Sequence, residues 1–379
     1  MELSQEAHHL IVRHVRSRQD LVTLSIVSRR FQKEAERALY DTLYLRGFEH
    51  TIAMCRLLAS TPRLSSLVAA LTIFVADVDS SDSEEEASPI PDDYWEAVAA
   101  ALRQTTKLRF LSIYFEQTGD TTQAWVLDGC TFRLETFHCD FEWDAHLASF
   151  LDTQTELSDL YLADFRNDPS QATEPTQDTN GTHATPSSNA PTLPKLSILE
   201  CTFTEAVTAL VPGRPVVRVK TCFSRTDLTE KRVELRDLHT HLKLSRRPLR
   251  ALDLADESYT PEFSLELLDM TVKAFSYAGN LRYLGTLVLP VDSAQRLEFY
   301  ASLMNLPSLQ CIEVDVSEWD PAPMTPAALR ALMFELRIYC PTVARMIFVY
   351  DFDRVVMKVE DNRCMLDGDA VPDTLWREM

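Results

Sequence analysis

Residues 108–113 read LRFLSI, residues 134–139 read LETFHC, and residues 157–162 read LSDLYL. All three follow a loose Leu-x-x-Leu-x-Leu pattern, with apolar residues at the first, fourth and sixth positions. The last two of these positions are two residues apart, so their side chains fall on the same face of a strand. Each stretch therefore predicts a short strand with one buried face, and their recurrence predicts a fold that repeats one small unit.

The spacing between these units is that of a leucine-rich repeat. Their first residues are 26 and 23 residues apart, and this repeat class has a period of about 20 to 29 residues. The pattern recurs as LSILEC from Leu196, LRALDL from Leu249, LQCIEV from Leu309, and more weakly as VAALTI from Val68, VVRVKT from Val216 and LGTLVL from Leu284. The sequence therefore contains nine candidate strands.

Helical patterns occupy the sequence between the candidate strands. They cover residues 93–107, 144–156, 263–279 and 325–340. A strand that buries one face under the helix following it must stack on similar neighbours to complete a core. The predicted fold class is therefore α/β, with a curved leucine-rich-repeat-like solenoid over residues 47–379. A doubly wound α/β domain is the alternative, although no Gly-rich βα turn supports it.

Two segments within this region have compositions that do not build a core. Residues 77–93 combine eight Asp or Glu with Ser and Pro, and residues 167–194 contain almost nothing apolar. We expect both to be low-complexity loops. Ser81 and Ser83 each precede a glutamate by three residues, which makes them candidate phosphorylation sites for an acid-directed kinase. The alternative is a purely solubilising run of charge.

Charge is distributed unevenly along the chain, whose net charge is −20 at pH 7. Residues 1–76 contain ten Lys or Arg and seven Asp or Glu, which leaves +3 there and −23 on the remainder. Because an acidic body repels phosphate groups, we expect no nucleic acid partner. The same acidic excess favours a basic patch on any protein that the repeats bind.

Targeting signals and cysteine spacing indicate the compartment. No stretch approaches the roughly 18 consecutive apolar residues of a transmembrane helix, and the first residues lack the basic-then-apolar layout of a secretory signal peptide. We therefore expect no membrane partner and a location in the cytoplasm, the nucleus or both. The eight cysteines form no CxxC pair, which favours reduced core thiols over a metal site.

Catalytic and metal-binding patterns are absent from the sequence. The chain lacks the Gly-x-Ser-x-Gly elbow, the GxxxxGK[ST] phosphate loop, Gly-x-Gly-x-x-Gly and His-Glu-x-x-His. His138 and Cys139 are adjacent in a predicted strand, so their side chains point to opposite faces and form no nucleophile–base pair. His239 and His241 would share a face of an extended segment, but no third ligand is near in sequence. We predict no catalytic residue, cofactor or metal.

The segment before the repeats, residues 20–45, has a helical pattern. Its apolar residues recur at steps of three and four; they are Leu21, Leu24, Val27, Phe31, Ala35 and Ala38. Bases lie between them, and Asp20 is placed to cap a helix. A helical module of about 40 residues seldom buries a self-sufficient core. We therefore expect the module, residues 1–46, to need a partner surface.

The order of residues in this module resembles the F-box family. The first part of the family pattern is matched by Leu3, Glu6, Leu10, Ile11 and Val15, and the second part by Asp20, Leu21, Leu24, Val27, Ser28, Arg29, Arg30, Phe31, Leu39 and Tyr40. Ser4, Ala7 and His8 depart from the pattern, and the resemblance covers residues 1–45. In that family the F-box binds the adaptor Skp1 and, through it, a cullin scaffold, while repeats behind it bind the target.

The resemblance implies the substrate-recognition subunit of a Skp1–cullin–F-box ubiquitin ligase, with an unidentified protein as its target. It assigns Skp1 contact to Leu3, Glu6, Leu10, Ile11, Asp20, Leu21, Leu24, Val27, Arg29, Arg30 and Phe31. The bases either speed association with an acidic adaptor or form a solvated helix face. The alternatives are a non-catalytic leucine-rich-repeat scaffold without a ligase role, and an enzyme with an unfamiliar site, which the absence of catalytic patterns disfavours.

Overall fold

The computed structural model describes six stretches of the chain. They are residues 4–75, 89–115, 122–163, 192–256, 260–274 and 280–379. Ser81, Ser83 and most of the two predicted loops lie outside the described residues. The chain forms two compact units: unit 1 comprises residues 1–166 and 192–194, and unit 2 comprises residues 167–191 and 195–379. This division differs from the predicted boundary after residue 46.

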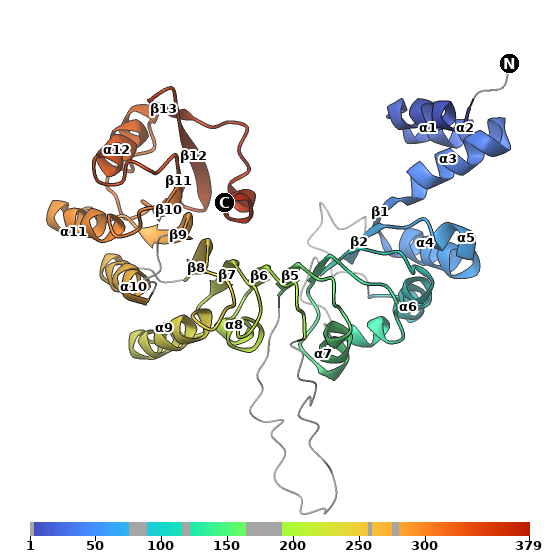
Figure 1. Ribbon diagram of the computed structural model, residues 1–379, viewed down its shortest axis with the longest axis horizontal. Helices are drawn as coiled ribbons and strands as arrows, with labels where there is room; N and C mark the ends of the chain where they lie inside the picture. The colour runs from blue at the N-terminus through green and yellow to red at the C-terminus, as the bar shows by residue number, and fades with distance from the viewer. Residues whose placement is uncertain (1–3, 76–88, 116–121, 164–191, 257–259, 275–279) are drawn as a thin grey trace, which may run out of the picture. The chain divides into compact units, whose positions relative to one another are not determined.

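Unit 1 begins with three short helices, each preceded by a serine cap. They are α1 (Gln5–His14), α2 (Arg18–Val27) and α3 (Arg29–Tyr40) (Figure 1). The hydroxyls of Ser4, Ser17 and Ser28 accept hydrogen bonds at 3.2–3.3 Å from the backbone N–H three residues later, which satisfies a donor that the first turn leaves free. The prediction that Asp20 caps a helix is wrong. Because α2 already begins at Arg18, Ser17 is the cap and Asp20 donates its N–H to it.

Parallel strands follow in unit 1, in the order of the chain. They are β1 (Thr42–Arg46), β2 (Ala70–Val75), β3 (Phe110–Phe115), β4 (Thr136–Cys139) and β5 (Asp159–Leu162). Between them lie α4 (Phe48–Ser60), α5 (Pro62–Ser65), α6 (Tyr94–Gln104), the 3-10 helix η1 (Ala124–Leu127) and α7 (Ala145–Asp152). Because β1 pairs with β2 along its length, residues 42–46 belong to the sheet rather than to the helical module.

The apolar positions of the repeat line up from strand to strand in unit 1. Leu71 lies opposite Leu111, and Leu111 lies opposite Phe137. Phe137 in turn lies opposite Leu160, and all four side chains are at most 1% exposed. Helices α4, α6 and α7 run along one side of these strands (Figure 1). Since burial of one such side chain contributes about 1.5–3 kcal/mol, this ladder is the core of unit 1.

Unit 2 continues the same construction and ends in two hairpins. Its parallel strands are β6 (Ile198–Cys201), β7 (Arg218–Cys222), β8 (Ala251–Ala255), β9 (Tyr283–Val288), β10 (Cys311–Asp315) and β11 (Arg345–Tyr350). The antiparallel strands are β12 (Asp353–Glu360) and β13 (Arg363–Leu366). Both residues of each hairpin turn have positive φ, at 351–352 and 361–362, as two-residue hairpin turns of the commonest type require.

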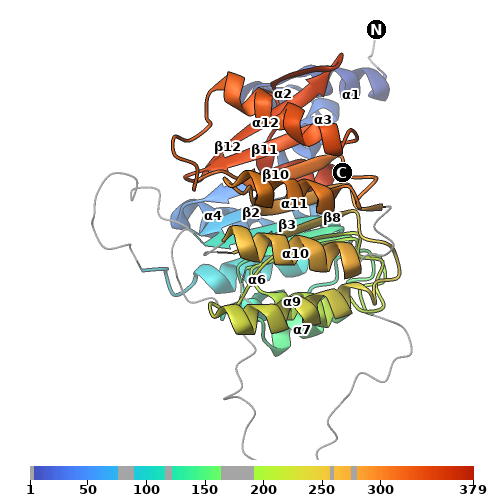
Figure 2. The same ribbon diagram turned by 90° about the vertical axis from the view of Figure 1, so that its left-hand side faces the viewer.

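One layer of helices covers one side of the strands of unit 2. These helices are α8 (Thr204–Leu210), α9 (Leu228–Leu242), α10 (Pro261–Ala274), α11 (Ser293–Leu303) and α12 (Pro326–Tyr339). Figure 2 shows α9, α10 and α11 following one another across the sheet. The doubly wound alternative is wrong, because strand order within each unit follows the chain and does not reverse. His239 and His241 belong to helix α9, so they do not share a strand face.

Each of the nine predicted strands is present, but one unit starts at a different residue. β9 begins at Tyr283, so its unit starts at the buried Leu281 rather than at Leu284. Its pairing with β10 shifts by one residue between Leu284 and Leu287. The bulge inserts one extra residue into β9, so Leu287 lies opposite Val314 where Thr286 would otherwise lie. As a result, Leu284, Leu287 and Leu289 fit the first, fourth and sixth positions of the pattern although the unit starts at Leu281. The sequence patterns did not predict β1, β11 or the final hairpins.

The last helix, α13 (Leu375–Glu378), packs against the side of the unit 2 strands that α8–α12 leave open. Leu375 and Trp376 are 1% exposed and join a cluster with Tyr283, Cys311 and Ile347. Arg377 pairs with a carboxylate of β6. The terminal segment therefore closes part of the face that the repeats themselves leave open.

Two buried carboxylates, Asp253 and Glu313, lie beside this cluster and are 2% and 1% exposed. Tyr283 Oη donates to Glu313 Oε2 at 2.7 Å, and Arg354 Nη2 lies 3.0 Å from Glu313 Oε1. Thr286 Oγ1 is 3.2 Å from Asp253 Oδ1. Burial, and secondly the charge of Asp253, raise the pKa of Glu313 to about 7. These groups therefore satisfy one another away from solvent.

The raised pKa of Glu313 predicts a pH-dependent stability. A carboxyl that binds its proton more tightly in the folded chain loses stability as it ionises, so its contribution falls as pH rises from 4.5 to about 7. Glu313→Gln cannot ionise, so its stability relative to wild type, measured as the free energy required for unfolding, should be greater at about pH 8 than at about pH 5. Denaturant titration measures this difference. Glu298→Gln, on the exposed side of α11, is the control and should show no such pH dependence. A Glu313→Gln difference that is equal at both pH values would contradict the assignment.

Candidate functional site

Among its described residues, the helical module leaves five large apolar side chains exposed and buries three apolar side chains. Its buried apolar residues are Val12, Leu21 and Ala35. Its exposed large apolar residues, here called the apolar surface, are Leu10 and Ile11 of α1 and Val22, Ile26 and Val27 of α2. Ile26 is 82% exposed and Val27 is 61% exposed. Helices α1 and α2 both pack against α3, and several large apolar side chains left exposed on one small module are typical of a protein that a partner covers.

Specific contacts hold the module in shape although its core is small. The ring of His8 packs edge-on against Phe31, with centroids 4.6 Å apart, and His8 Nδ1 lies 2.7 Å from the carbonyl oxygen of Ser4. Glu36 of α3 pairs with Arg63 of α5. The last contact attaches the module to the first repeat of unit 1.

The residues that the F-box resemblance assigns to Skp1 contact fall into different environments. Leu21 is buried inside the module, and Leu24 and Phe31 are half-buried. Leu3 lies outside the described residues. The exposed members are Glu6, Leu10, Ile11, Asp20, Val27, Arg29 and Arg30. Exposure therefore leaves seven of the assigned residues available to a partner, whereas Leu21 supports the module from within.

Val22 and Ile26 belong to the apolar surface but were not identified from the sequence. The sequence pattern runs the stripe from Leu21 to Phe31 as though through one helix. The structure breaks this stripe at Ser28, whose extended backbone ends α2 and caps α3. The stripe therefore belongs to two helices, and within α2 Leu21 is buried whereas Val22 and Ile26 are exposed. A serine three residues before Phe31 is the signal that marks this break.

The strands of unit 1 expose a second surface on the side without α4, α6 and α7. It is lined by aromatic rings, here called the aromatic face: Tyr44, Phe74, Phe110, Tyr114, His138 and Tyr161. These residues alternate along the strands with the buried ladder. Rings of this face lie close together. The ring centroids are 6.5 Å apart for Phe74 and Tyr114, and 6.3 Å apart for Tyr114 and Tyr161.

Polar groups within the aromatic face fix the orientation of its rings. Tyr114 Oη lies 3.1 Å from His138 Nδ1, and His138 Nε2 lies 3.4 Å from Asp159 Oδ1. The guanidinium of Arg46 stands 5.4 Å from the centroid of Phe74. Rings fixed in place that retain polar edges are typical of protein recognition surfaces, because they add contact area with little loss of conformational entropy.

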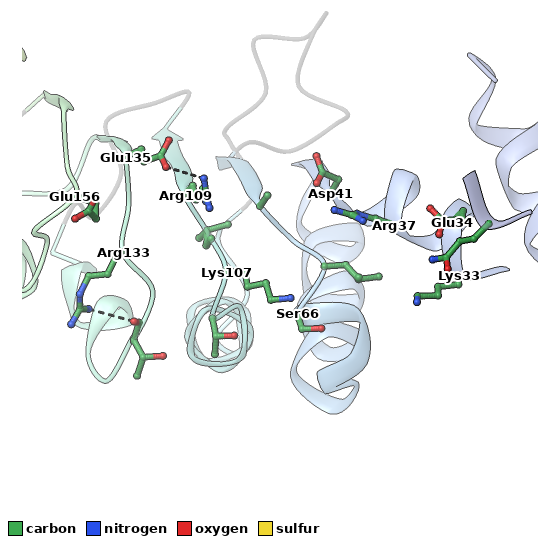
Figure 3. Close-up of a pocket in the computed structure, with 16 residues that line it drawn as sticks. Lys33, Glu34, Arg37, Asp41, Ser66, Lys107, Arg109, Arg133, Glu135 and Glu156 are labelled. Carbon is green, nitrogen blue, oxygen red and sulfur yellow. Dashed lines mark hydrogen bonds and ion pairs between the residues drawn. The ribbon is translucent and has the colours of Figure 1, made fainter. Parts of the chain in front are cut away.

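A groove of about 840 Å³ separates α3 from the turns that lead into β2, β3, β4 and β5. Figure 3 shows bases and carboxylates alternating along it. Arg109 is paired with Glu135 at 3.1 Å, and Arg133 donates to backbone carbonyls of its own turn. Since charges of both signs line the groove and several are already paired, it has no clear preference for a cation or an anion.

The His, Cys, Asp and Glu side chains of the described residues bear on metal binding and on thiol reactivity. Among them, no three His, Cys, Asp or Glu side chains are grouped to hold a metal ion. The described cysteines form no disulfide, six of the eight are buried, and burial raises the pKa of Cys55 to about 12, which suppresses the reactive thiolate. Within the described helices, none has the length and apolar character needed to cross a membrane.

Comparison with known proteins adds no family assignment. No protein-family model matches the chain, and no curated protein matches it either. The functional interpretation therefore depends on the apolar surface, the aromatic face and the residues that resemble an F-box.

Proposed function

We propose that this protein is the substrate-recognition subunit of a Skp1–cullin–F-box ubiquitin ligase. In this proposal the helical module binds a Skp1-like adaptor, the adaptor binds the cullin, and the repeats bind a target protein. The supporting observation is the apolar surface of α1 and α2. Leaving Ile26 and its neighbours in water costs free energy that a partner recovers on covering them.

The departures from the F-box pattern have structural roles in this module. Ser4, in place of the family's proline, caps α1 through its hydroxyl. His8 is 6% exposed and packs on Phe31. Helix α1 is therefore formed in spite of these departures, and it carries Leu10 and Ile11 on its outside. This arrangement supports retention of an adaptor-binding module.

The repeats of both units support the second half of the proposal. We infer that they are segments of a curved leucine-rich-repeat-like solenoid, because each unit stacks strand–helix repeats in chain order. The aromatic face of unit 1 is the recognition surface we propose for the target protein. Tyr44, 59% exposed, lies on its first strand and offers a ring to a partner.

A repeat scaffold without a ligase role is the second candidate function. The aromatic face favours it as much as it favours a ligase subunit, because target binding needs no adaptor. The two functions differ only in what the apolar surface of the module contacts. Binding of a Skp1-like adaptor therefore distinguishes them.

Replacing Ile26 by Asp should weaken adaptor binding by about tenfold or more while the fold is kept. Ile26 is 82% exposed, so the carboxylate is tolerated in the free chain but is left without water in the complex. Loss of one such apolar contact is worth about 1.5–3 kcal/mol, which is at least about tenfold in Kd. Calorimetric titration with purified Skp1 measures the change. Leu297→Asp, at a half-exposed leucine of α11, is the matched control and should bind as wild type does.

Failure of the wild-type chain to bind Skp1 at micromolar concentration would leave the scaffold as the better proposal. Equal affinity of Ile26→Asp and wild type would place the adaptor elsewhere. Leu21→Asp is not a useful variant, because Leu21 is buried inside the module. Circular dichroism confirms that each variant retains its helices.

Charge reversal at the start of α3 should slow association with the adaptor. Arg29 and Arg30 are exposed in the first turn, where glutamate also suits the helix dipole, so Arg29→Glu with Arg30→Glu keeps the fold. If the bases steer an acidic adaptor, the association rate falls and its dependence on salt weakens, while the dissociation rate changes little. Stopped-flow mixing over a range of salt concentrations measures both rates. An effect confined to dissociation would show that the bases make direct contacts instead.

A further inference from the structure

A cluster of bases on unit 2 stands out in a chain of net charge −20. The basic patch comprises Lys243, Arg246, Arg247, Arg250 and Arg282, all exposed. Four of them lie in the turn between α9 and β8, and Arg282 lies just before β9. Among the described residues, none of the five side chains has an ion-pair partner. The unpaired charge distinguishes this patch from the mixed groove of unit 1.

Three bases of the patch, Lys243, Arg246 and Arg247, line a cavity of about 380 Å³, and Arg250 and Arg282 lie outside this lining. Among the described residues, these three bases are the charged lining, and neither Asp nor Glu contributes to it. The remaining lining includes Pro248 and apolar side chains of the same turn and of the chain before β9. The site therefore combines positive charge at its edge with an apolar interior.

Backbone hydrogen bonds hold the patch in place. Arg246 N donates to the carbonyl of Arg214 at 2.9 Å, and Ser245 Oγ donates to the carbonyl of Val216 at 2.7 Å. Arg282 N donates to the carbonyl of Arg250 at 2.7 Å. The last bond sets Arg250 and Arg282 side by side although they are far apart in sequence. A ligand thus meets bases whose backbone is already ordered, which lowers the entropic cost of binding.

Favourable interaction with the end of helix α9 explains the position of only some of these bases. Lys243 is the C-cap of α9, where a cation interacts favourably with the carbonyl end of the helix. The effect falls off within one turn, and Arg250 and Arg282 lie beyond it, at the starts of β8 and β9. Bases that line one cavity and have no ion-pair partner among the described residues therefore point to an anionic ligand.

The charge of the whole chain selects the kind of anion. A long nucleic acid or an anionic membrane extends past the patch and meets the acidic remainder of the protein. A short acidic peptide stays within the field of the patch, because screening limits that field to about 8 Å at physiological ionic strength. The apolar interior of the cavity suits one apolar side chain next to the carboxylates.

We propose that the basic patch binds a short acidic segment of a partner protein, with an apolar residue of that segment in the cavity. This binding site goes beyond adaptor capture and does not depend on it. It also reverses, for this surface, the expectation that the acidic repeats select a basic partner. The local charge of five bases, rather than the net charge of the chain, decides which sign of peptide is attracted.

Fluorescence anisotropy of the full chain with a labelled Glu/Leu peptide tests the proposal. We expect saturable binding that weakens with salt, and no binding of a Gln/Leu peptide of equal length. Arg246→Glu with Arg247→Glu should weaken binding by about tenfold or more, since two attractive pairs become repulsive. Arg330→Glu with Arg363→Glu, at exposed bases of α12 and β13, is the matched control and should bind as wild type does.

Other ligands and variants separate the alternatives. Replacement of Arg246 and Arg247 by Lys should retain most of the affinity, which would show that charge rather than the particular side chain is read. Equal binding by wild type and the Arg246→Glu, Arg247→Glu variant would overturn the proposal. Tighter capture of single-stranded DNA or of phosphatidylserine vesicles than of the Glu/Leu peptide would also overturn it. Thermal unfolding of each variant confirms that unit 2 is intact.

Discussion

Burial of every second strand residue beneath a single layer of helices is the constraint on which the rest of the structure depends. In unit 1, Leu111 has an apolar neighbour on each adjoining strand and a helix above it, so no repeat completes its core alone. The same alternation places Tyr114 and His138 on the side that helices α4, α6 and α7 do not cover. Unit 2 obeys this constraint too, but there α13 closes part of the open side with Trp376.

The sequence predicted those features whose signals are local. The pattern Leu-x-x-Leu-x-Leu spans six residues and identified most strands, because strand burial has a period of two. β1 was missed because its residues were assigned to the helical module, residues 1–46. Val22 and Ile26 were missed because the apolar stripe was drawn through Leu21, whereas Val22 and Ile26 are exposed. Asp253 and Glu313 are brought together around Thr286, and Arg250 is linked to Arg282 by a backbone hydrogen bond. Both contacts depend on strand register between distant segments, which no local pattern contains.

The surfaces of this protein differ in chemistry, and the difference separates their roles. The module offers apolar side chains such as Ile26, which gain free energy from burial and favour a stable adaptor complex. The aromatic face offers fixed rings with polar edges, which suit selection of a target. The basic patch offers unpaired charge beside a small cavity, which favours fast and salt-sensitive capture of an acidic segment. The three surfaces thus suit partners of different chemistry, which is the basis of the proposed roles.

Hydrogen–deuterium exchange of the full chain, with and without purified Skp1, tests the central claim most directly. An adaptor that covers the apolar surface slows exchange of backbone amides in α1 and α2, and it leaves exchange in α9–α12 of unit 2 unchanged. Protection confined to the helical module, α1 to α3, is the result that the proposed ligase subunit requires. Unchanged exchange throughout the module at saturating Skp1 would contradict it.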